Sequence, residues 1–335
     1  MTVRIAINGF GRIGRNVLRA ISEHNRTDVS VVALNDLGDA ATNVHLFKYD
    51  SVHGPFRGEV KVGENGFDIG YGPIQVLSER DPSKLPWRDL DIDVVMECTG
   101  VFSDREKAAS HLKAGAKKVL VSAPSKGADL TVVYGVNHDK LERKHEVVSN
   151  ASCTTNCLAP VAKVINDLCG ISQGYMTTIH SYTNDQRILD LPHSDLRRAR
   201  AAALSMIPTT TGAAKAVGLV LPELAGKLDG TAIRVPTPNV SLIDLCFIPT
   251  RETSVSDINH AMERASEQRL KGVLSVVRDE LVSIDFNHSS YSSNFDLTQT
   301  QIVDGRLVRV LSWYDNEWGF SCRMSDVAVA LGKLI

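Results

Sequence analysis

A glycine-rich turn between an apolar run and an amphipathic segment places the strongest constraint on the fold. Residues 3–8 (VRIAIN) predict a buried strand and residues 11–22 predict a helix, with Gly9, Gly11 and Gly14 in the spacing Gly-x-Gly-x-x-Gly. In such a unit the first glycine permits a tight turn, the second lets the backbone approach a ligand, and the third lets the helix lie close to the strand. This segment therefore predicts the first strand and helix of a parallel α/β sheet.

The rest of the first 150 residues repeats this alternation. Further strands are expected at 29–35, 94–100, 117–123, 131–136 and 146–150, a helix at 40–48, and a hairpin at Asn65-Gly66 between 58–62 and 66–70. The strands are rich in Val and Ile and mostly apolar throughout, as in a parallel sheet covered on both faces. We therefore expect an α/β fold, with a Rossmann-type doubly wound parallel sheet in a domain over residues 1–150.

The pattern changes after residue 150. A helix is expected at 152–168, a strand at 174–180, a polar, arginine-rich segment at 181–203, strand-like stretches at 231–249 and 290–313, and a final helix at 319–335. This pattern predicts a second, α+β domain over residues 151–318 with a largely antiparallel sheet. We expect the final helix to pack back on the first domain. A polar loop of about 20 residues inside a compact domain is typically functional or interfacial.

Composition narrows the class of protein. The chain has 335 residues, a net charge of −2, 43% hydrophobic residues and 23% charged residues, which suits two globular domains. A net charge this small gives no overall attraction for nucleic acid or an acidic membrane. The sequence shows no signal peptide and no apolar run of the roughly 18 to 20 residues that cross a bilayer. We therefore expect a cytoplasmic protein without nucleic-acid or membrane partners.

The cysteines do not form a framework. Six of them occur, at positions 98, 153, 157, 169, 246 and 322, too sparse and uneven for a disulfide scaffold in a chain of this length. Cys153 and Cys157 have three residues between them, which does not match common zinc-ligand pairs, and no His or Cys partners cluster nearby. We expect reduced thiols and no metal site.

The glycine-rich turn also predicts a cofactor. The N-terminus of the helix that follows it offers free N–H groups and a positive dipole to phosphates. Asp36 lies 22 residues beyond Gly14, at the end of the second predicted strand, where a carboxylate accepts hydrogen bonds from an adenosine ribose. That carboxylate would repel a 2′-phosphate, so the pattern favours NAD over NADP. The competing interpretation is a purely structural glycine turn with an unrelated Asp36.

One cysteine is placed to act as a nucleophile. Cys153 lies at the junction between a predicted strand and a predicted helix, where the helix dipole stabilises a thiolate. His180 ends the predicted strand 174–180, 27 residues downstream, and can return to the same sheet end as a general base. Cys157, one turn further into the helix, is assigned a structural role.

Several features near this pair favour anions. Residues 208–212 (PTTTG) precede a predicted helix and offer hydroxyls and backbone N–H groups. Arg197, Arg198 and Arg200 occur together, and Arg234 lies in a predicted strand. Clustered arginines more often form a solvated face or an oligomer contact, and we keep that interpretation for Arg198 and Arg200.

Eight motifs in order resemble one family. They are NGFGRIGR (8–15), ERDP (79–82), ECTG (97–100), SNASCTTNC (149–157), HSYTNDQ (180–186), PTTTGAAKAV (208–217), RVPTPNVS (234–241) and WYDNEWGF (313–320). Along essentially its whole length the chain resembles the phosphorylating, NAD-dependent glyceraldehyde-3-phosphate dehydrogenases. SNASCTTNC is the most specific of these motifs.

The resemblance implies a reaction and an assembly. Cys153 would attack the aldehyde of glyceraldehyde 3-phosphate with His180 as base, and the thiohemiacetal would pass hydride to NAD. Inorganic phosphate would then attack the resulting thioester and release 1,3-bisphosphoglycerate, a step of glycolysis. The resemblance also implies a homotetramer, in which the segment 181–203 packs beside the cofactor site of a neighbouring subunit.

The resemblance further assigns binding residues. Cofactor contacts are implied for Asn8, Gly9, Phe10, Gly11, Arg12, Ile13, Gly14, Asp36, Arg80, Thr99, Gly100, Ser122, Asn184 and Asn316, the last toward the nicotinamide carboxamide. Contacts to the substrate phosphate or its surroundings are implied for Thr183, Asp185, Arg197 and Arg234, and contacts to the attacking phosphate for Ser152, Thr154, Thr211 and Gly212. Leu37 and Pro192 match the strictly NAD-using type, whereas Phe320 departs from the tyrosine of many relatives.

Three alternatives stay open at this point. Erythrose-4-phosphate dehydrogenase shares the cofactor and cysteine motifs, and the retained Thr183 and Asn184 favour the triose substrate over it. A hydroxy-acid dehydrogenase would use the same cofactor fold without a nucleophilic cysteine. A non-catalytic NAD-binding protein would have lost Cys153 or His180, and both are present.

Overall fold

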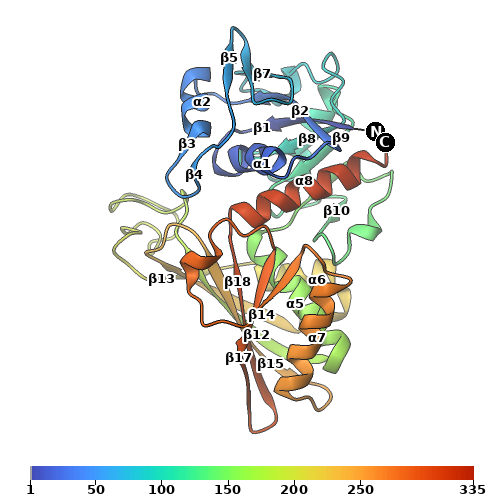
Figure 1. Cartoon of the computed structure of the whole chain (residues 1–335), viewed down its shortest axis with the longest axis vertical. Coiled ribbons are helices and arrows are strands. Elements are labelled where there is room, and N and C mark those ends of the chain that lie inside the picture. The colour runs from blue at the N-terminus through green and yellow to red at the C-terminus, as the bar shows by residue number, and fades with distance from the viewer. Residues whose placement is uncertain (1) are drawn as a thin grey trace. The chain divides into compact units, whose positions relative to one another are not determined.

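The chain folds into two compact units. The computed structural model describes residues 2–335 (Figure 1). The first unit comprises the residues up to Ser152 together with Ser321–Ile335, and the second comprises Cys153–Phe320. Both termini belong to the first unit and lie beside each other, with Gly332 packed against Val3.

The first unit is built on a nine-stranded sheet with the order β10-β11-β9-β8-β1-β2-β7-β6-β5. Its strands are β1 (Val3–Asn8), β2 (Val29–Asn35), β5 (Lys61–Gly63), β6 (Gly66–Asp68), β7 (Pro73–Leu77), β8 (Val94–Glu97), β9 (Lys118–Val121), β10 (Leu130–Thr131) and β11 (Val147–Ser149). All pairings from β10 to β7 are parallel, and only the hairpin strands β6 and β5 add antiparallel pairs. The expected doubly wound parallel sheet is confirmed.

Short helices and turns complete this unit. They are α1 (Arg12–Glu23), α2 (Ala40–Lys48), α3 (Arg105–Ala108), α4 (Ser110–Lys113), the 3-10 turns η1 (Pro82–Lys84) and η2 (His138–Lys140), and the small hairpin β3 (Tyr49–Asp50) and β4 (Gly54–Pro55). The order of the strands reverses at β1, which has β2 on one side and β8 on the other. In open α/β sheets the carboxyl ends of strands at such a reversal form the ligand crevice.

One predicted strand of this unit is wrong. The run 131–136 was expected to continue as a strand, but β10 ends at Thr131 and a turn follows. The Asn137 side chain accepts a hydrogen bond from Val133 N (2.8 Å) and donates one to Thr131 O (2.9 Å), so it occupies backbone groups that a ladder would have paired. The apolar side chains of Val132 and Val133 are buried in the core, although these residues do not extend the sheet.

The second unit contains a seven-stranded sheet with the order β13-β14-β12-β15-β18-β17-β16. Its strands are β12 (Ile171–Ser181), β13 (Ile207–Thr210), β14 (Leu228–Val235), β15 (Ser241–Pro249), β16 (Leu274–Val277), β17 (Ser293–Val303) and β18 (Leu307–Tyr314). The pairs β12–β14 and β16–β17 are parallel and the others are antiparallel. The expected, largely antiparallel sheet is confirmed, and each long strand-like stretch splits into two strands.

Helices cover this sheet. They are α5 (Cys153–Cys169), α6 (Ala213–Val220) and α7 (Val255–Glu267), with the 3-10 turns η3 (Pro222–Leu224) and η4 (Ser283–Phe286); α8 (Trp318–Gly332) begins here and belongs mostly to the first unit. The sequence analysis missed α7, although Ser254 and Asp257 form a capping box at its start. Within residues 2–335 no helix is long and apolar enough to cross a membrane.

Candidate active site

The second unit brings the predicted nucleophile and base together. Cys153 is the first residue of α5, and His180 is the penultimate residue of β12. The Sγ atom of Cys153 lies 3.6 Å from Nε2 of His180. His180 is buried and Cys153 is partly exposed, so an aldehyde can reach the sulfur while the base stays shielded. The geometry is that of a thiol and its general base.

Local backbone geometry presents the sulfur. Ala151, two residues before Cys153, is buried and has a φ of +56°, a conformation that alanine rarely adopts. Such strain is characteristic of functional turns. The N–H groups of Cys153 and Thr154 at the start of α5 are directed at the sulfur, where they lower the pKa of the thiol.

Burial has the opposite effect to these N–H groups on the pKa of the Cys153 thiol. It is the largest influence on Cys153 and raises the pKa of the thiol, while the Arg234 cation and the hydrogen bonds from Thr154 lower it. Burial and the Arg234 cation lower the pKa of His180 to about 3, against a smaller opposing effect of the Ser181 carbonyl. The unliganded pair is therefore a thiol beside a neutral imidazole. The N–H groups at the start of α5 lower the pKa of the thiol, but burial outweighs them, so the thiol must lose its proton as the sulfur attacks.

Arg234 is positioned by the sheet. His180 and Arg234 are direct neighbours in the parallel pairing of β12 with β14. One guanidinium nitrogen lies 2.6 Å from Nδ1 of His180 and 2.9 Å from Ser181 O, and Nδ1 itself lies 2.7 Å from Ser181 O. In one neutral tautomer Nδ1 accepts from Arg234, and in the other it donates to the carbonyl of Ser181; the second tautomer leaves Nε2 able to accept the proton of Cys153.

Arg234 also keeps binding capacity. Its buried Nε–H has no hydrogen-bond partner within residues 2–335. Burial lowers the pKa of this guanidinium, yet arginine stays charged in proteins. A half-buried cation with an unused donor beside the nucleophile is suited to an anionic group of a substrate.

The three arginines of the 181–203 loop lie in different settings. Arg198 donates to Asp185 (2.6 Å), to the Thr209 hydroxyl (2.9 Å) and to Thr210 O (3.2 Å), so it ties the loop to β13. The prediction that Arg198 lies on a solvated or oligomer face stays a prediction; within the chain Arg198 is half-buried and held by these bonds. Arg200 is exposed and pairs with Asp190 at 2.7 Å. Arg197 is exposed. Its backbone N–H donates to the Asp195 carboxylate and its carbonyl accepts from Arg200 N, and no described contact gives its side chain a hydrogen bond.

The remaining predicted substrate residues lie in different settings. Thr183 and Thr211 are half-buried, Asn184 and Gly212 are exposed, and Ser152 is half-buried at the end of the first unit. Thr154 is buried, and its hydroxyl is 2.8 Å from that of Tyr314, which lies 2.9 Å from the Thr178 hydroxyl. The Tyr314 ring meets His180 edge-on at 5.9 Å. Sequence reasoning missed Tyr314, although it lies in the WYDNEWGF motif.

Asn316 has a fixed orientation. Its Oδ1 accepts hydrogen bonds from the hydroxyls of Ser181 (2.8 Å) and Ser241 (2.9 Å). The Nδ2 group is thereby left as a donor, which suits recognition of an amide carbonyl.

In the first unit the glycine turn has the expected shape. Gly9 has a φ of +91°, and a Cβ there would lie 2.7 Å from Thr99 N. A Cβ on Gly14 would lie 2.2 Å from Gly9 O, whereas a Cβ on Gly11 would meet no protein atom within 4 Å. Gly9 and Gly14 thus leave no room for a side chain, because backbone atoms pack against them, whereas Gly11 faces open space. The turn fits the close approach of a pyrophosphate.

A pocket of about 360 Å³ opens beside this turn. Its walls include Asn8, Gly9, Gly11, Asp36, Leu37, Arg80, Thr99 and Val101. The Asp36 carboxylate is held by Phe10 N and Gly38 N, each at 2.8 Å, which fixes its direction and leaves lone pairs for ribose hydroxyls. The pocket therefore fits the adenosine side of a dinucleotide.

Other predicted cofactor residues serve the protein itself. The Phe10 ring is buried and stacks on Phe47 at 6.1 Å, so Phe10 contributes through its backbone. Arg12 forms an ion pair with Asp50. Thr99 and Gly100 are exposed, Ile13 and Ser122 are half-buried, and Gly100 has a φ of +75°.

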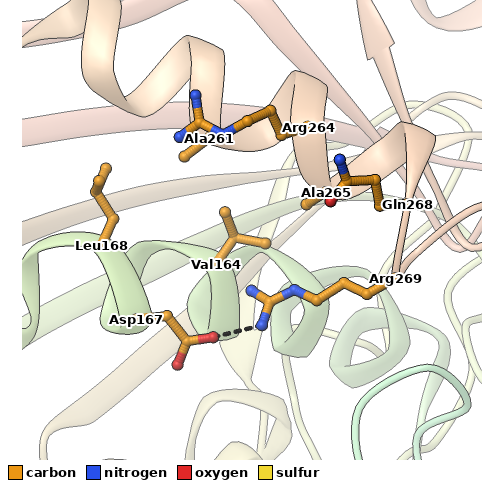
Figure 2. A pocket seen from close by; sticks show the side chains of 8 residues that line it. All are labelled: Val164, Asp167, Leu168, Ala261, Arg264, Ala265, Gln268 and Arg269. Carbon is orange, nitrogen blue, oxygen red and sulfur yellow. Dashed lines mark hydrogen bonds and ion pairs between the residues drawn. The ribbon is translucent and has the colours of Figure 1, made fainter.

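A second hollow lies between α5 and α7 (Figure 2). Its one drawn ion pair joins Arg269 to Asp167 at 2.6 Å, and it contains no thiol, imidazole or hydroxyl. Within residues 2–335 no group of His, Cys, Asp and Glu is arranged to hold a metal.

Comparison with known proteins identifies the family. The family profile described as glyceraldehyde 3-phosphate dehydrogenase, NAD binding domain, matches residues 3–105, and the profile described as its C-terminal domain matches residues 152–316. The glyceraldehyde-3-phosphate dehydrogenase of Xanthobacter flavus is 68% identical over 334 residues, which is 100% of both chains. The chain belongs to the glyceraldehyde-3-phosphate dehydrogenase family.

Other members of this family are nearly as similar. The enzymes of that name from Cereibacter sphaeroides and Geobacillus stearothermophilus are 63% and 58% identical and match over at least 99% of each chain. The first family profile contains the glycine turn and Asp36, so the chain has an NAD-binding domain, as expected. The second contains Cys153, His180, Arg234 and Asn316.

Proposed function

We propose that the protein oxidises D-glyceraldehyde 3-phosphate with NAD and inorganic phosphate to 1,3-bisphosphoglycerate. The observation that carries the proposal is the 3.6 Å approach of Cys153 Sγ to His180 Nε2, beside the half-buried Arg234. A hydroxy-acid dehydrogenase needs no such thiol, and the full-length relatives carry the name of the triose phosphate enzyme.

The first half of the reaction uses Cys153 and His180. Nε2 accepts the thiol proton as Sγ bonds to the aldehyde carbon, which gives a thiohemiacetal. The N–H of Cys153 stabilises the negative charge that develops on the carbonyl oxygen. The proton held at Nε2 passes to that oxygen and gives the hydroxyl of the thiohemiacetal, and Nε2 takes the same proton back as the C–H bond breaks. NAD, when bound, supplies the hydride acceptor.

The second half regenerates the thiol. An oxygen of inorganic phosphate attacks the acyl carbon of the thioester, the C–S bond breaks, and a proton held at His180 returns to Cys153. A thioester is activated enough for this transfer, so the oxidation energy is kept in the acyl phosphate.

The loops around Cys153 and His180 offer groups that can bind the two phosphates of the reaction. We propose that Arg234, Arg197 and Thr183 contact the C3 phosphate, and that Ser152, Thr154, Thr211 and Gly212 receive the attacking phosphate. Asp185, itself an anion, acts by holding Arg198 and with it the loop. The Thr154 side chain faces Tyr314, so its contribution comes from the backbone N–H at the start of α5.

The NAD contacts are proposed on the same basis. Asp36 receives the ribose hydroxyls, and the turn at Gly9, Phe10, Gly11, Arg12, Ile13 and Gly14 receives the pyrophosphate. The further proposed NAD contacts are Asn8, Arg80, Thr99, Gly100, Ser122, Asn184 and Asn316. The fixed Asp36 carboxylate supports a preference for NAD over NADP.

The proposal extends to organisation and location. The first unit, with the C-terminal helix, would be the NAD-binding domain and the second the catalytic domain. A homotetramer is supported by exposed apolar side chains on and beside the 181–203 loop, such as Ile188 and Leu204. All six cysteines are free thiols, which supports a reducing, cytoplasmic setting.

The test is NAD reduction followed at 340 nm with glyceraldehyde 3-phosphate, with and without inorganic phosphate, beside a parallel assay with erythrose 4-phosphate. Rapid turnover of the triose that depends on phosphate is expected, with Cys153→Ala as the inactive control. Faster oxidation of erythrose 4-phosphate would overturn the substrate assignment and keep the mechanism. Turnover that ignores phosphate would overturn the phosphorylating reaction.

A further inference from the structure

A buried carboxylate at the end of β8 has no role in the reaction above. Glu97 is 1% exposed and begins the ECTG motif. Its Oε2 accepts hydrogen bonds from Asn8 Nδ2 (2.6 Å) and His111 Nε2 (3.0 Å). Its Oε1 accepts from Thr99 N (2.8 Å) and from the Thr99 hydroxyl. Four donors thus converge on one side chain.

The four donors require a hydrogen-bond acceptor at position 97. Trp87 Nε1–H donates to His111 Nδ1 at 2.9 Å, so the proton of a neutral His111 must be on Nε2, directed at Glu97. His111 is fully buried, and the Trp87 ring is buried with it. A protonated Glu97 would direct its own O–H at one of these donors, so the ionised form fits the site.

The position of Glu97 in the sheet links it to the cofactor pocket. Asn8 and Glu97 are direct neighbours at the carboxyl ends of β1 and β8, where the strand order reverses. The loops that follow these strands touch, since a Cβ on Gly9 would lie 2.7 Å from Thr99 N. Both loops line the 360 Å³ pocket.

The network reaches a third strand. The Oδ1 of Asn8 accepts from Asn35 Nδ2 (2.8 Å) at the end of β2, and the Oδ1 of Asn35 accepts from Glu79 N (2.8 Å). The Asn8 side chain is therefore fully engaged inside the protein. The segments at three edges of the pocket are held through one chain of hydrogen bonds that ends on Glu97.

We propose that Glu97 is a positioning residue for NAD, which holds the loops after β1 and β8 in the arrangement that receives the cofactor. The inference rests on the proposed use of NAD. Glu97 contacts the loops and not the reacting atoms, so its loss should weaken cofactor binding and leave the chemistry of Cys153 intact.

The test compares Glu97→Gln with wild type and with Glu106→Gln, a matched change at an exposed carboxylate of α3. The amide keeps the shape of Glu97 but directs its NH2 group at one of the donors. NAD binding measured by calorimetry is expected to weaken about tenfold, the scale of one lost charge-assisted hydrogen bond. KM for NAD should rise equally, while kcat at saturating NAD and KM for the triose change less than about twofold.

A second variant tests the inference if Glu97→Gln folds poorly. Trp87→Phe removes the donor that sets the His111 tautomer together with part of a fully buried ring, so NAD binding should weaken roughly twofold to fivefold beside a lower melting temperature. Unchanged NAD affinity in folded Glu97→Gln, with only a lower melting temperature, would overturn the inference and reduce Glu97 to a structural role. Failure of the wild type to bind NAD would instead overturn the proposed function.

Discussion

Burial and charge act on the Cys153 thiol in opposite directions. Burial raises its pKa, whereas the nearby Arg234 cation lowers it. The reactivity of the sulfur thus depends on a residue 81 positions away in sequence, which the parallel pairing of β12 and β14 brings beside His180.

Arg234→Gln should slow alkylation of Cys153. Without the cation the thiol pKa rises further, so less thiolate is present at pH 7.5. We expect iodoacetamide to react roughly threefold to tenfold more slowly, the effect of losing one nearby charge. The rate of loss of activity measures it, with Arg200→Gln, an exposed arginine paired with Asp190, as the control. Equal or faster alkylation in Arg234→Gln would contradict the electrostatic account.

His180→Asn should lower turnover by roughly 100- to 10,000-fold, the usual range for loss of a general base. The pKa of His180 lies at about 3, so the wild-type imidazole is in its base form throughout pH 5 to 8. In the variant the thiol, with its raised pKa, must ionise unaided, so residual turnover should climb more steeply with pH than wild-type turnover. A near-normal rate across this range would remove His180 from the mechanism.

Side-chain chemistry was predictable only in part. The sequence identified Cys153, His180 and Arg234 because their motifs are specific and their strand positions are readable. It could not identify Tyr314, whose hydroxyl meets Thr154 across 160 residues of chain, nor the attachment of Arg198 to Asp185 and Thr209. A contact between distant residues depends on how elements pack, which local patterns do not encode.

At the level of elements, the turn before α1 separates two uses of glycine. Gly14→Ala should lower stability, because its Cβ would lie 2.2 Å from Gly9 O; overpacking of this kind costs about 1–3 kcal/mol. Gly11→Ala should keep its melting temperature but weaken NAD binding, because the new methyl group enters open space beside the pocket. Melting curves and calorimetry on both variants test this. Equal losses of melting temperature would refute the distinction.

The contact between α1 and β3 should give stability that depends on pH. Burial alone would raise the pKa of Asp50, but hydrogen bonds from Arg12 and from His53 N and Val52 N lower it to about 2. This pKa is below that of the unfolded chain, so the contribution is complete above pH 4 and is lost as pH falls toward 2. Asp50→Asn should therefore cost about 2 kcal/mol at pH 7 and almost nothing near pH 2, as measured by urea unfolding. A cost that does not change with pH would contradict the assignment.

The elements themselves were mostly predictable. Alternating apolar runs and the glycine turn located the strands and helices of the first unit, because buried parallel strands are apolar throughout. The strand expected at 131–136 failed because Asn137 captures the backbone there. The parallel pairing of β12 with β14 was not foreseeable, since strand direction within a mixed sheet follows from the connection through β13 and α6.

For the whole molecule, large apolar side chains on and beside the 181–203 loop are exposed, which supports the proposed homotetramer. Ile188 is 86% exposed and Leu204 is 82% exposed. We expect light scattering to give a particle of about four times the 36.5 kDa chain. The double variant Ile188→Asp/Leu204→Asp should dissociate it, whereas Val303→Asp in the β17–β18 hairpin should not. A monomeric wild type would exclude the tetramer.

The family could be read from the sequence because its motifs extend over the whole chain, and the profiles and relatives agree with it. The oligomeric state is harder to predict from the sequence. Apolar residues of the 181–203 loop are interspersed with charges, so their exposure becomes visible only after the loop has folded.

The parallel pairing of β12 with β14 has a consequence for changing the specificity of this protein. Both strands run in the same direction, so the segments that leave them, 182–206 and 236–240, start from the same edge of the sheet. His180 and Arg234 are anchored in the strands, before these segments begin. A library of variants confined to the two segments could therefore explore new aldehydes while the backbone that supports the base and its cation stays unchanged.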